Sequence, residues 1–118
     1  MKHRELIEIE LLADTGKAIC DMTADGTTDS NTIRMMLVDS GAKFQQIITL
    51  AEAAQADLLD IHIQAKAGKL IVTLGADYAN GFEEMQLLII EAQSKFSAIS
   101  VLAQQYQVNN LKKVKQEA

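Results

Sequence analysis

The segment FEEMQLLIIEAQSKFSAISVLAQQY, residues 82–106, decides the fold of this chain. Its apolar residues follow one another at alternating steps of three and four: Phe82, Met85, Ile89, Ala92, Phe96, Ile99, Ala103 and Tyr106. A mean step of 3.5 residues keeps all eight on one stripe of a long helix, which is the pattern of a helix packed along another helix. The segment therefore predicts a long packing helix, and its pattern carries no catalytic chemistry.

The sequence before this helix, residues 58–75, changes period. Apolar and polar residues alternate over residues 59–65, and residues 70–74 are rich in β-branched side chains. Gly68 lies between the two runs, and a short glycine-containing turn between two such runs predicts a β-hairpin. A lone hairpin is only marginally stable in water, so we expect it to lie on the helices, with an edge available to a second copy.

The first half of the chain predicts two helices. The first is expected from about Arg4 to Met22, with a strand over residues 5–12 as the alternative because that stretch partly alternates. The polar residues 23–29 predict a loop, and Asp29 or Ser30 is expected to cap a second helix over residues 31–56.

Two signals mark the ends of the long helix. Asn80 and Glu83 have the spacing of a capping box, with Asn in place of the usual Ser or Thr. The helix is expected to fray after Asn109 and Asn110.

These elements predict one α+β domain over residues 1–118. The expected order is helix, helix, β-hairpin and long helix, with a small antiparallel sheet packed on the helices. The alternative is an all-α bundle in which residues 58–74 remain helical. The chain contains no proline, repeat or low-complexity linker that would indicate a second domain.

Charge and composition exclude several functional classes. The formal net charge is −5, and residues 5–110 hold 15 acidic but only 6 basic side chains, which disfavours general nucleic-acid binding. No run of 18 apolar residues is present, so no membrane span is expected. A single cysteine excludes an internal disulfide and is typical of a reducing compartment, so we expect a soluble cytoplasmic protein.

The sharpest local motif is DMTADGTTDSNT, residues 21–32. It resembles part of the twelve-residue calcium loop of EF-hand proteins, in which oxygens come from positions 1, 3, 5, 7, 9 and 12 and glycine stands at position 6. The resemblance implies a calcium site and the ligands Asp21, Thr23, Asp25 and Asp29, with the carbonyl of Thr27. The match covers 12 of 118 residues, and Thr32 stands where the family has a bidentate Glu. The alternative interpretation is an acidic connector between two helices.

Two carboxylate pairs raise an enzymatic alternative. Glu5 and Glu8, and likewise Asp57 and Asp60, are three residues apart. On facing helices such pairs can hold Mg²⁺ over a phosphate, as in all-helical nucleotide pyrophosphohydrolases. Asp60 is expected on a strand, however, and no basic cluster accompanies the pairs. A Mg²⁺-dependent hydrolase of this kind therefore stays an alternative.

No catalytic residue is predicted. His62 is expected on the polar face of the hairpin beside Asp60, where a His–Asp pair could transfer protons, but no nucleophile is arranged with it. Cys20 lies on the apolar face of the first helix, which is typical of a small core residue.

The flanks of the long helix are apolar as well, and a helix that is apolar nearly all round must be covered nearly all round. We therefore predict a homodimer with an interface formed by Met85, Leu87, Ile89, Phe96, Ile99, Val101 and Tyr106. The alternative is that the stripe is buried by the helices of the same chain.

These observations favour a small acidic interaction protein without catalysis. It would act as a homodimer on a protein partner, as an adaptor, chaperone or inhibitor does. Accessory proteins of phages and other mobile elements belong to this class. Calcium is the only cofactor that the sequence suggests.

Overall fold

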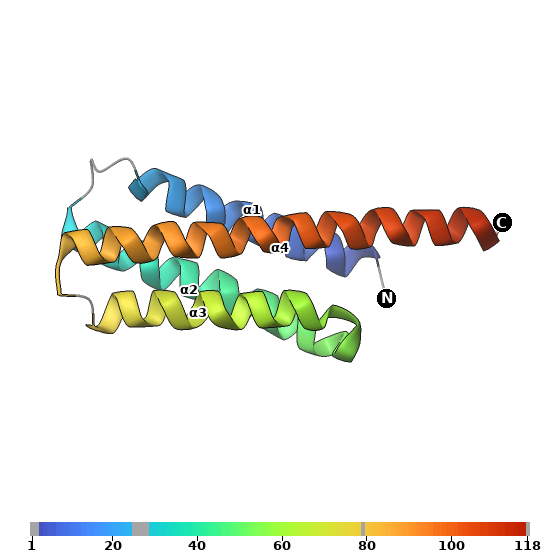
Figure 1. Ribbon diagram of the computed structural model, residues 1–118, viewed down its shortest axis with the longest axis horizontal. Helices are drawn as coiled ribbons and strands as arrows, with labels where there is room; N and C mark the ends of the chain where they lie inside the picture. Colours follow the sequence, from blue (N-terminus) through green and yellow to red (C-terminus); the bar gives the residue numbers. More distant parts are fainter. Residues whose placement is uncertain (1–2, 25–28, 79, 118) are drawn as a thin grey trace.

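The computed structural model describes residues 3–24, 29–78 and 80–117, and these residues form four α-helices (Figure 1). The helices are α1 (His3–Ala24), α2 (Ser30–Ala53), α3 (Leu59–Tyr78) and α4 (Phe82–Glu117). A short 3₁₀-helix, η1 (Gln55–Leu58), joins α2 to α3. The described residues contain no strand.

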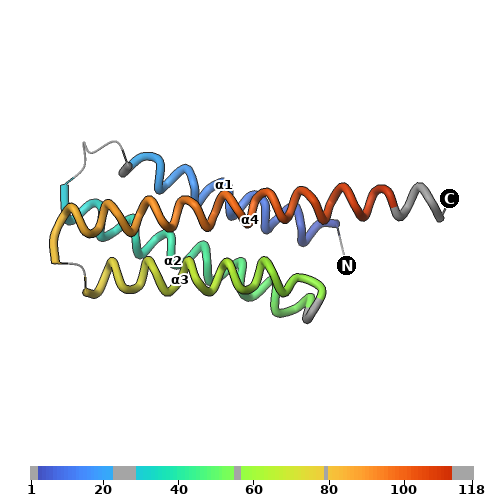
Figure 2. The backbone as a smooth tube through the Cα atoms, viewed as in Figure 1, coloured from blue at the N-terminus to red at the C-terminus, as the bar shows by residue number. Residues whose placement is uncertain are grey.

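The four helices lie side by side and run alternately up and down, so each packs against its two neighbours in a four-helix bundle (Figure 1). Helices α2 and α4 also meet across the diagonal, whereas α1 and α3 do not. The molecule measures 55 × 24 × 16 Å. Helix α4 extends beyond the end formed by the N-terminus of α1 and the connection from α2 to α3 (Figure 2).

The core is formed by one apolar stripe from each helix. The fully buried members on α4 are Met85, Ile89, Ala92, Phe96, Ile99 and Ala103. Phe82 and Tyr106 pack partly buried at the ends of the same stripe. The long packing helix predicted over residues 82–106 is therefore confirmed, and the other helices of the same chain bury most of its stripe.

The predicted α+β fold is wrong, because residues 58–74 form helix and not a β-hairpin. The alternative, an all-α bundle, describes the structure. The buried residues of α3 are Ile61, Ala65, Gly68, Val72 and Gly75, at steps of four and three. This helical stripe was hidden because two of its five members are glycines, Gly68, which the hairpin interpretation assigned to the turn, and Gly75, which lay at the end of the predicted hairpin.

Both glycines stand at close contacts between helices, and at Gly68 the neighbouring ring leaves no room for a larger side chain. A Cβ atom at Gly68 would lie 2.2 Å from the ring of Phe44 in α2, and one at Gly75 would lie 3.0 Å from Leu37 Cδ1. Neither contact is visible in the sequence around α3, because both partners lie on another helix.

The first half of the chain agrees with its prediction in outline. Helix α1 runs through residues 5–12, so the alternative of a strand there is wrong. Asp29 caps α2, since its Oδ1 accepts a hydrogen bond of 2.8 Å from the backbone N–H of Thr32. The second helix ends at Ala53, earlier than the predicted residue 56.

The start of α4 also differs from its prediction. The backbone N–H of Asn80 donates to Oε2 of Glu84 at 3.4 Å, so the reciprocal carboxylate is Glu84 and not Glu83. Gly81 holds the cap position with φ of +149°, and its carbonyl accepts the first backbone hydrogen bond of the helix, from Met85. The helix continues beyond Asn110 to Glu117, so the predicted fraying after residues 109–110 is not observed.

Candidate interaction surface

The most distinctive surface feature is a second apolar stripe on α4, which we call the outer stripe. Its members again follow steps of three and four: Leu87, Ile90, Ser94, Ser97, Val101, Gln104, Val108 and Leu111. All are exposed except Ser97, which is half-buried. Between 47% and 61% of the surface of Leu87, Ile90, Val101, Val108 and Leu111 is accessible. Five large apolar side chains therefore face solvent along one helix.

The core stripe of α4 runs through the buried residues from Met85 to Ala103. In each seven-residue repeat the positions of the outer stripe fall between successive positions of the core stripe, so the two stripes lie on roughly opposite sides of α4. A helix with two apolar stripes on opposite sides needs two sets of packing partners. Its own chain supplies only the inner set.

A row of side-chain hydrogen bonds fixes the orientation of α4 against α1. Ser100 Oγ donates to Asp14 Oδ1 at 2.7 Å, and Gln104 and Gln107 both donate to the carboxylate of Glu10 at 2.8 Å. Gln93 donates to Asp21 in the same way. All donors lie on α4 and all acceptors on α1, so the row holds one edge of α4 against α1. Gln104, a member of the outer stripe, belongs to this row, whereas the five large apolar members of the stripe are exposed.

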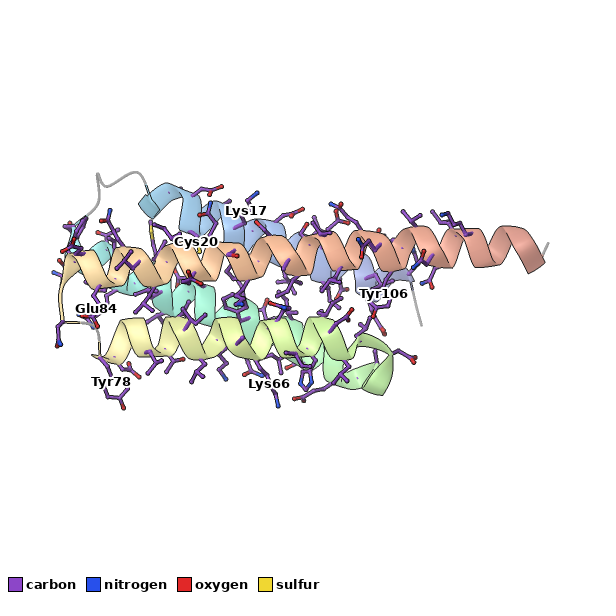
Figure 3. The ribbon with its side chains drawn as sticks, in the orientation of Figure 1. Lys17, Cys20, Lys66, Tyr78, Glu84 and Tyr106 are labelled. Atoms are coloured by element: carbon purple, nitrogen blue, oxygen red, sulfur yellow. The ribbon has the colours of Figure 1, made fainter. Side chains whose placement is uncertain are left out.

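The opposite edge of α4 is held by α3. The hydroxyl of Tyr106 donates to Asp60 Oδ1 at 2.9 Å, toward the end of the bundle where α3 begins (Figure 3). Burial raises the pKa of Tyr106 above its ordinary value, and the hydrogen bond to Asp60 raises it further. The phenol is therefore a stable donor over the neutral pH range.

The structure separates the seven residues predicted for the dimer interface into two groups. Met85, Ile89, Phe96 and Ile99 are fully buried inside the chain and have no surface to offer a partner. Tyr106 is half-buried at the contact with α3. Only Leu87 and Val101 are exposed, and both belong to the outer stripe.

The residues predicted as calcium ligands are spread along a helix end and a cap. Asp21 lies in α1 and accepts a hydrogen bond from Gln93, whereas Asp29 caps α2. The Thr32 N–H bond lowers the pKa of Asp29, because it favours the carboxylate form. Thr23 lies in the last turn of α1, and Asp25 and Thr27 lie outside the described residues. Calcium binding by this segment stays a prediction.

The carboxylate pairs and His62 do not come together. Glu5 and Glu8 lie on α1, where Glu8 pairs with Arg4 at 3.7 Å. Asp60 lies in the first turn of α3, so its predicted place on a strand is wrong. No cluster of three or more His, Cys, Asp or Glu side chains suited to a metal occurs in the part of the chain that is described.

His62 lies on α3, and not on the polar face of a hairpin as predicted. Its Nε2 is 3.3 Å from Glu52 Oε1 of α2. The contact joins two neighbouring helices near the connection between them, so we interpret it as a contact that supports the packing of α3 on α2.

Cys20 is fully buried between the helices, as its position on the apolar face of α1 predicted. Its sulfur lies 3.7 Å from Ser40 Oγ of α2. Burial raises the pKa of the thiol to about 11, and the contact with Ser40 offsets this only in part. The group is therefore a neutral thiol at physiological pH.

A groove of about 580 Å³ lies between α1 and α2. It is lined by Glu8, Leu11, Leu12 and Thr15 from α1 and by Gln45, Gln46, Thr49 and Leu50 from α2. Three leucines and five polar side chains share this lining, and such a mixture is the character of a surface that accepts apolar side chains. The groove lies on a different side of the bundle from the outer stripe, since α2 is diagonally opposite α4.

Sequence reasoning missed Ile90, Val108 and Leu111 as members of one surface with Leu87 and Val101. The signal was present, because these five residues share the step pattern that identified the core stripe. Three polar members, Ser94, Ser97 and Gln104, interrupt the outer stripe and concealed it.

No described helix is long and apolar enough to cross a membrane. Comparison with known proteins found no matching family model, no matching curated protein and no matching solved structure.

Proposed function

We propose that this chain is a non-catalytic interaction protein that acts as a homodimer on a protein partner. The observation that carries the proposal is the outer stripe of α4. It repeats a helix-packing pattern over residues 87–111 of the longest helix, and its five large apolar side chains are left exposed by the chain itself. Exposed large apolar side chains gathered on one face of a helix are typical of sites of protein association.

A helix is the partner element that this surface fits best. Apolar side chains at steps of three and four are the pattern that a helix presents to another helix. The small side chains of Ser94 and Ser97 near the middle of the stripe allow a close approach of the two backbones.

The groove between α1 and α2 supports the second half of the proposal, an additional protein partner. It lies away from the outer stripe, so a dimer formed through α4 leaves it open. The two neighbouring helices present Leu11 and Leu12 from α1 and Leu50 from α2, and these leucines suit apolar side chains of a bound segment.

The dimer is tested by light scattering of the purified chain over a range of concentrations. The chain has a mass of 12.9 kDa, and we expect a species of twice that mass. Val101→Glu should give the monomer, because it places a charge at the centre of the outer stripe. Val38→Glu is the matched control: Val38 on α2 is 60% exposed against 52% for Val101, and it lies outside the stripe. A monomer at all concentrations would contradict the proposed dimer.

The partner site is tested by Leu11→Glu, which places a charge in the groove and should leave the dimer intact. We expect a partner that forms a defined complex with the purified dimer to lose binding to Leu11→Glu and to keep binding to Val38→Glu. Equal binding to both variants would place the partner elsewhere.

A further inference from the structure

We propose that the outer stripe pairs with the outer stripe of a second copy in the antiparallel direction. In the register we infer, Leu87 lies opposite the partner's Leu111 and Ile90 opposite the partner's Val108. The inference rests on the proposed function and specifies the geometry of the proposed dimer. This register fixes the direction of the two helices and the residues that meet.

The order of residues along the outer stripe is compatible with this register. Two large apolar residues stand at each end of the stripe, Leu87 and Ile90 at one and Val108 and Leu111 at the other. When a second stripe is turned end for end, apolar ends meet apolar ends. In the middle, Ser97 meets the partner's Val101, so a small side chain faces a larger one. A two-fold axis through the middle of α4 generates all these contacts.

Charge selects the antiparallel direction. Residues 82–117 carry four acidic and four basic side chains, so the formal net charge of −5 belongs to the rest of the chain. Contact through α4 therefore avoids bringing together two acidic surfaces. Within α4, Glu83, Glu84 and Glu91 stand toward the N-terminus, and Lys112, Lys113 and Lys115 toward the C-terminus. Antiparallel helices place the acidic end of one against the basic end of the other, and parallel helices place like charges together.

Glu84 and Lys112 form the specific charge pair. They occupy equivalent positions on the same edge of the outer stripe, four whole seven-residue repeats apart. In the proposed register Glu84 lies opposite the partner's Lys112, and the two-fold axis repeats this pair at the other end. Both side chains are exposed, and Glu84 also accepts the Asn80 N–H through Oε2 at the start of α4. The opposite edge carries Gln86, Gln93 and Gln107, which add no repulsion. The antiparallel helix dipoles act in the same sense.

The area that α4 offers is sufficient for a dimer of moderate affinity. A helix of 36 residues is about 54 Å long, and a strip about 10 Å wide along it has a footprint of about 540 Å². The two copies together then cover about 1,100 Å², which is near the lower limit of specific interfaces. Full overlap of the two helices also covers the part of α4 that extends beyond α1 (Figure 2). We therefore expect a dimer that dissociates on dilution.

The direction is tested by disulfide formation in a Cys20→Ala background, where an introduced cysteine is the sole thiol. One chain carries Leu87→Cys, and a second, isotopically labelled chain carries Leu111→Cys. Under mild oxidation we expect a disulfide between labelled and unlabelled chains, because the two positions face each other. Neither chain alone should form its own disulfide efficiently. A mixture of Leu87→Cys with Val38→Cys is the control and should remain reduced.

The register is tested by charge reversal. Glu84→Lys and Lys112→Glu should each raise the dissociation constant of the dimer about tenfold at low salt, because each places two like-charged pairs in the interface. The double variant carries both reversals in one chain and should return to within about threefold of the parent. Lys66→Glu on α3 is the control for net charge and should also stay within about threefold.

The outcomes distinguish this inference from the proposed function. Efficient disulfide formation by Leu87→Cys alone would show a parallel dimer, and would overturn the inference while leaving the dimer standing. If the chain is dimeric but no pair of introduced cysteines reacts, the interface lies elsewhere. The same holds if the double reversal fails to recover binding. Either result would overturn the inference and leave the dimer standing. A chain that stays monomeric throughout would overturn both.

Discussion

The rings of Phe44 and Phe96 stack face to face across the diagonal of the bundle, with centroids 3.8 Å apart and planes within 5° of each other. They come from α2 and α4, and each stands against a glycine on a neighbouring helix. A Cβ at Gly68 would lie 2.2 Å from the Phe44 ring, and a Cβ at Gly16 would lie 2.3 Å from the Phe96 ring. Two large and two small residues thus fill one layer of the core, one from each helix. This layer sets how closely the four helices approach.

The first prediction concerns Gly16. Gly16→Ala should lower the free energy of unfolding by about 1–3 kcal/mol, because its methyl group would overlap the ring of Phe96, which is also stacked on the Phe44 ring. Urea denaturation measures the change. Helix propensity alone would make the alanine variant more stable by about 1 kcal/mol. A loss of stability would therefore be due to the overlap with the Phe96 ring.

Gly41→Ala provides the control for this prediction. A Cβ at Gly41 would lie 3.3 Å from Val72 Cγ2, a contact that a small adjustment can relieve. We expect its stability to stay within about 1 kcal/mol of the parent. A Gly16→Ala variant as stable as Gly41→Ala would refute the packing role of the glycine. Phe96→Leu should reduce the penalty of Gly16→Ala if the ring is its cause.

The second prediction concerns the buried thiol. Because burial raises the pKa of Cys20 from 9.0 to about 11, the folded state keeps the proton at pH values where the unfolded state has lost it. The contribution to stability is complete below pH 9 and should be lost as the pH rises toward 11. The free energy of unfolding of the parent should therefore fall more steeply over this range than that of Cys20→Ala. If the free energies of unfolding of the parent and of Cys20→Ala fall in parallel over this pH range, the raised pKa of Cys20 is contradicted.

The third prediction concerns the cap of α2. Asp29→Ala should lower the melting temperature by a few degrees at pH 7, because it removes the acceptor for the Thr32 N–H, whereas Asp29→Asn should keep most of the cap. The folded-state pKa of Asp29 lies below its ordinary 3.8. Its carboxylate therefore stabilises the fold above that value and loses this effect as the pH falls below it. Melting curves from pH 7 to pH 3 should show the difference between parent and Asp29→Asn shrinking in acid.

The fourth prediction tests calcium binding by residues 21–32. If the segment binds calcium, the melting temperature should rise with calcium concentration, by an amount equivalent to about 2.7 kcal/mol at 100 times the dissociation constant. Asp25→Asn should abolish the rise, and Asp39→Asn, at an exposed position of α2, should not. An unchanged melting temperature in millimolar calcium would exclude the site.

The sequence was sufficient where a stripe consisted of large residues. The steps of three and four from Met85 to Ala103 identified the buried face of α4, and Cys20 was assigned to the core correctly. The same reasoning failed on α3, where Gly68 and Gly75 occupy core positions. A glycine in such a position gives no hydrophobic signal, and its reason for being there is a ring or a leucine on another helix.

The amino-acid sequence by itself determined that this chain forms a long packing helix with more apolar surface than one stripe requires. Periodicity is a local property, so it can be read without knowledge of neighbours. Only the tertiary structure decided that helices of the same chain cover the stripe from Met85 to Ala103, because that depends on which helices lie beside α4 and on the row of hydrogen bonds from Gln93, Ser100, Gln104 and Gln107 to α1. It also decided that residues 59–78 are helical, since the space for Phe44 beside Gly68 exists only when both helices are in place.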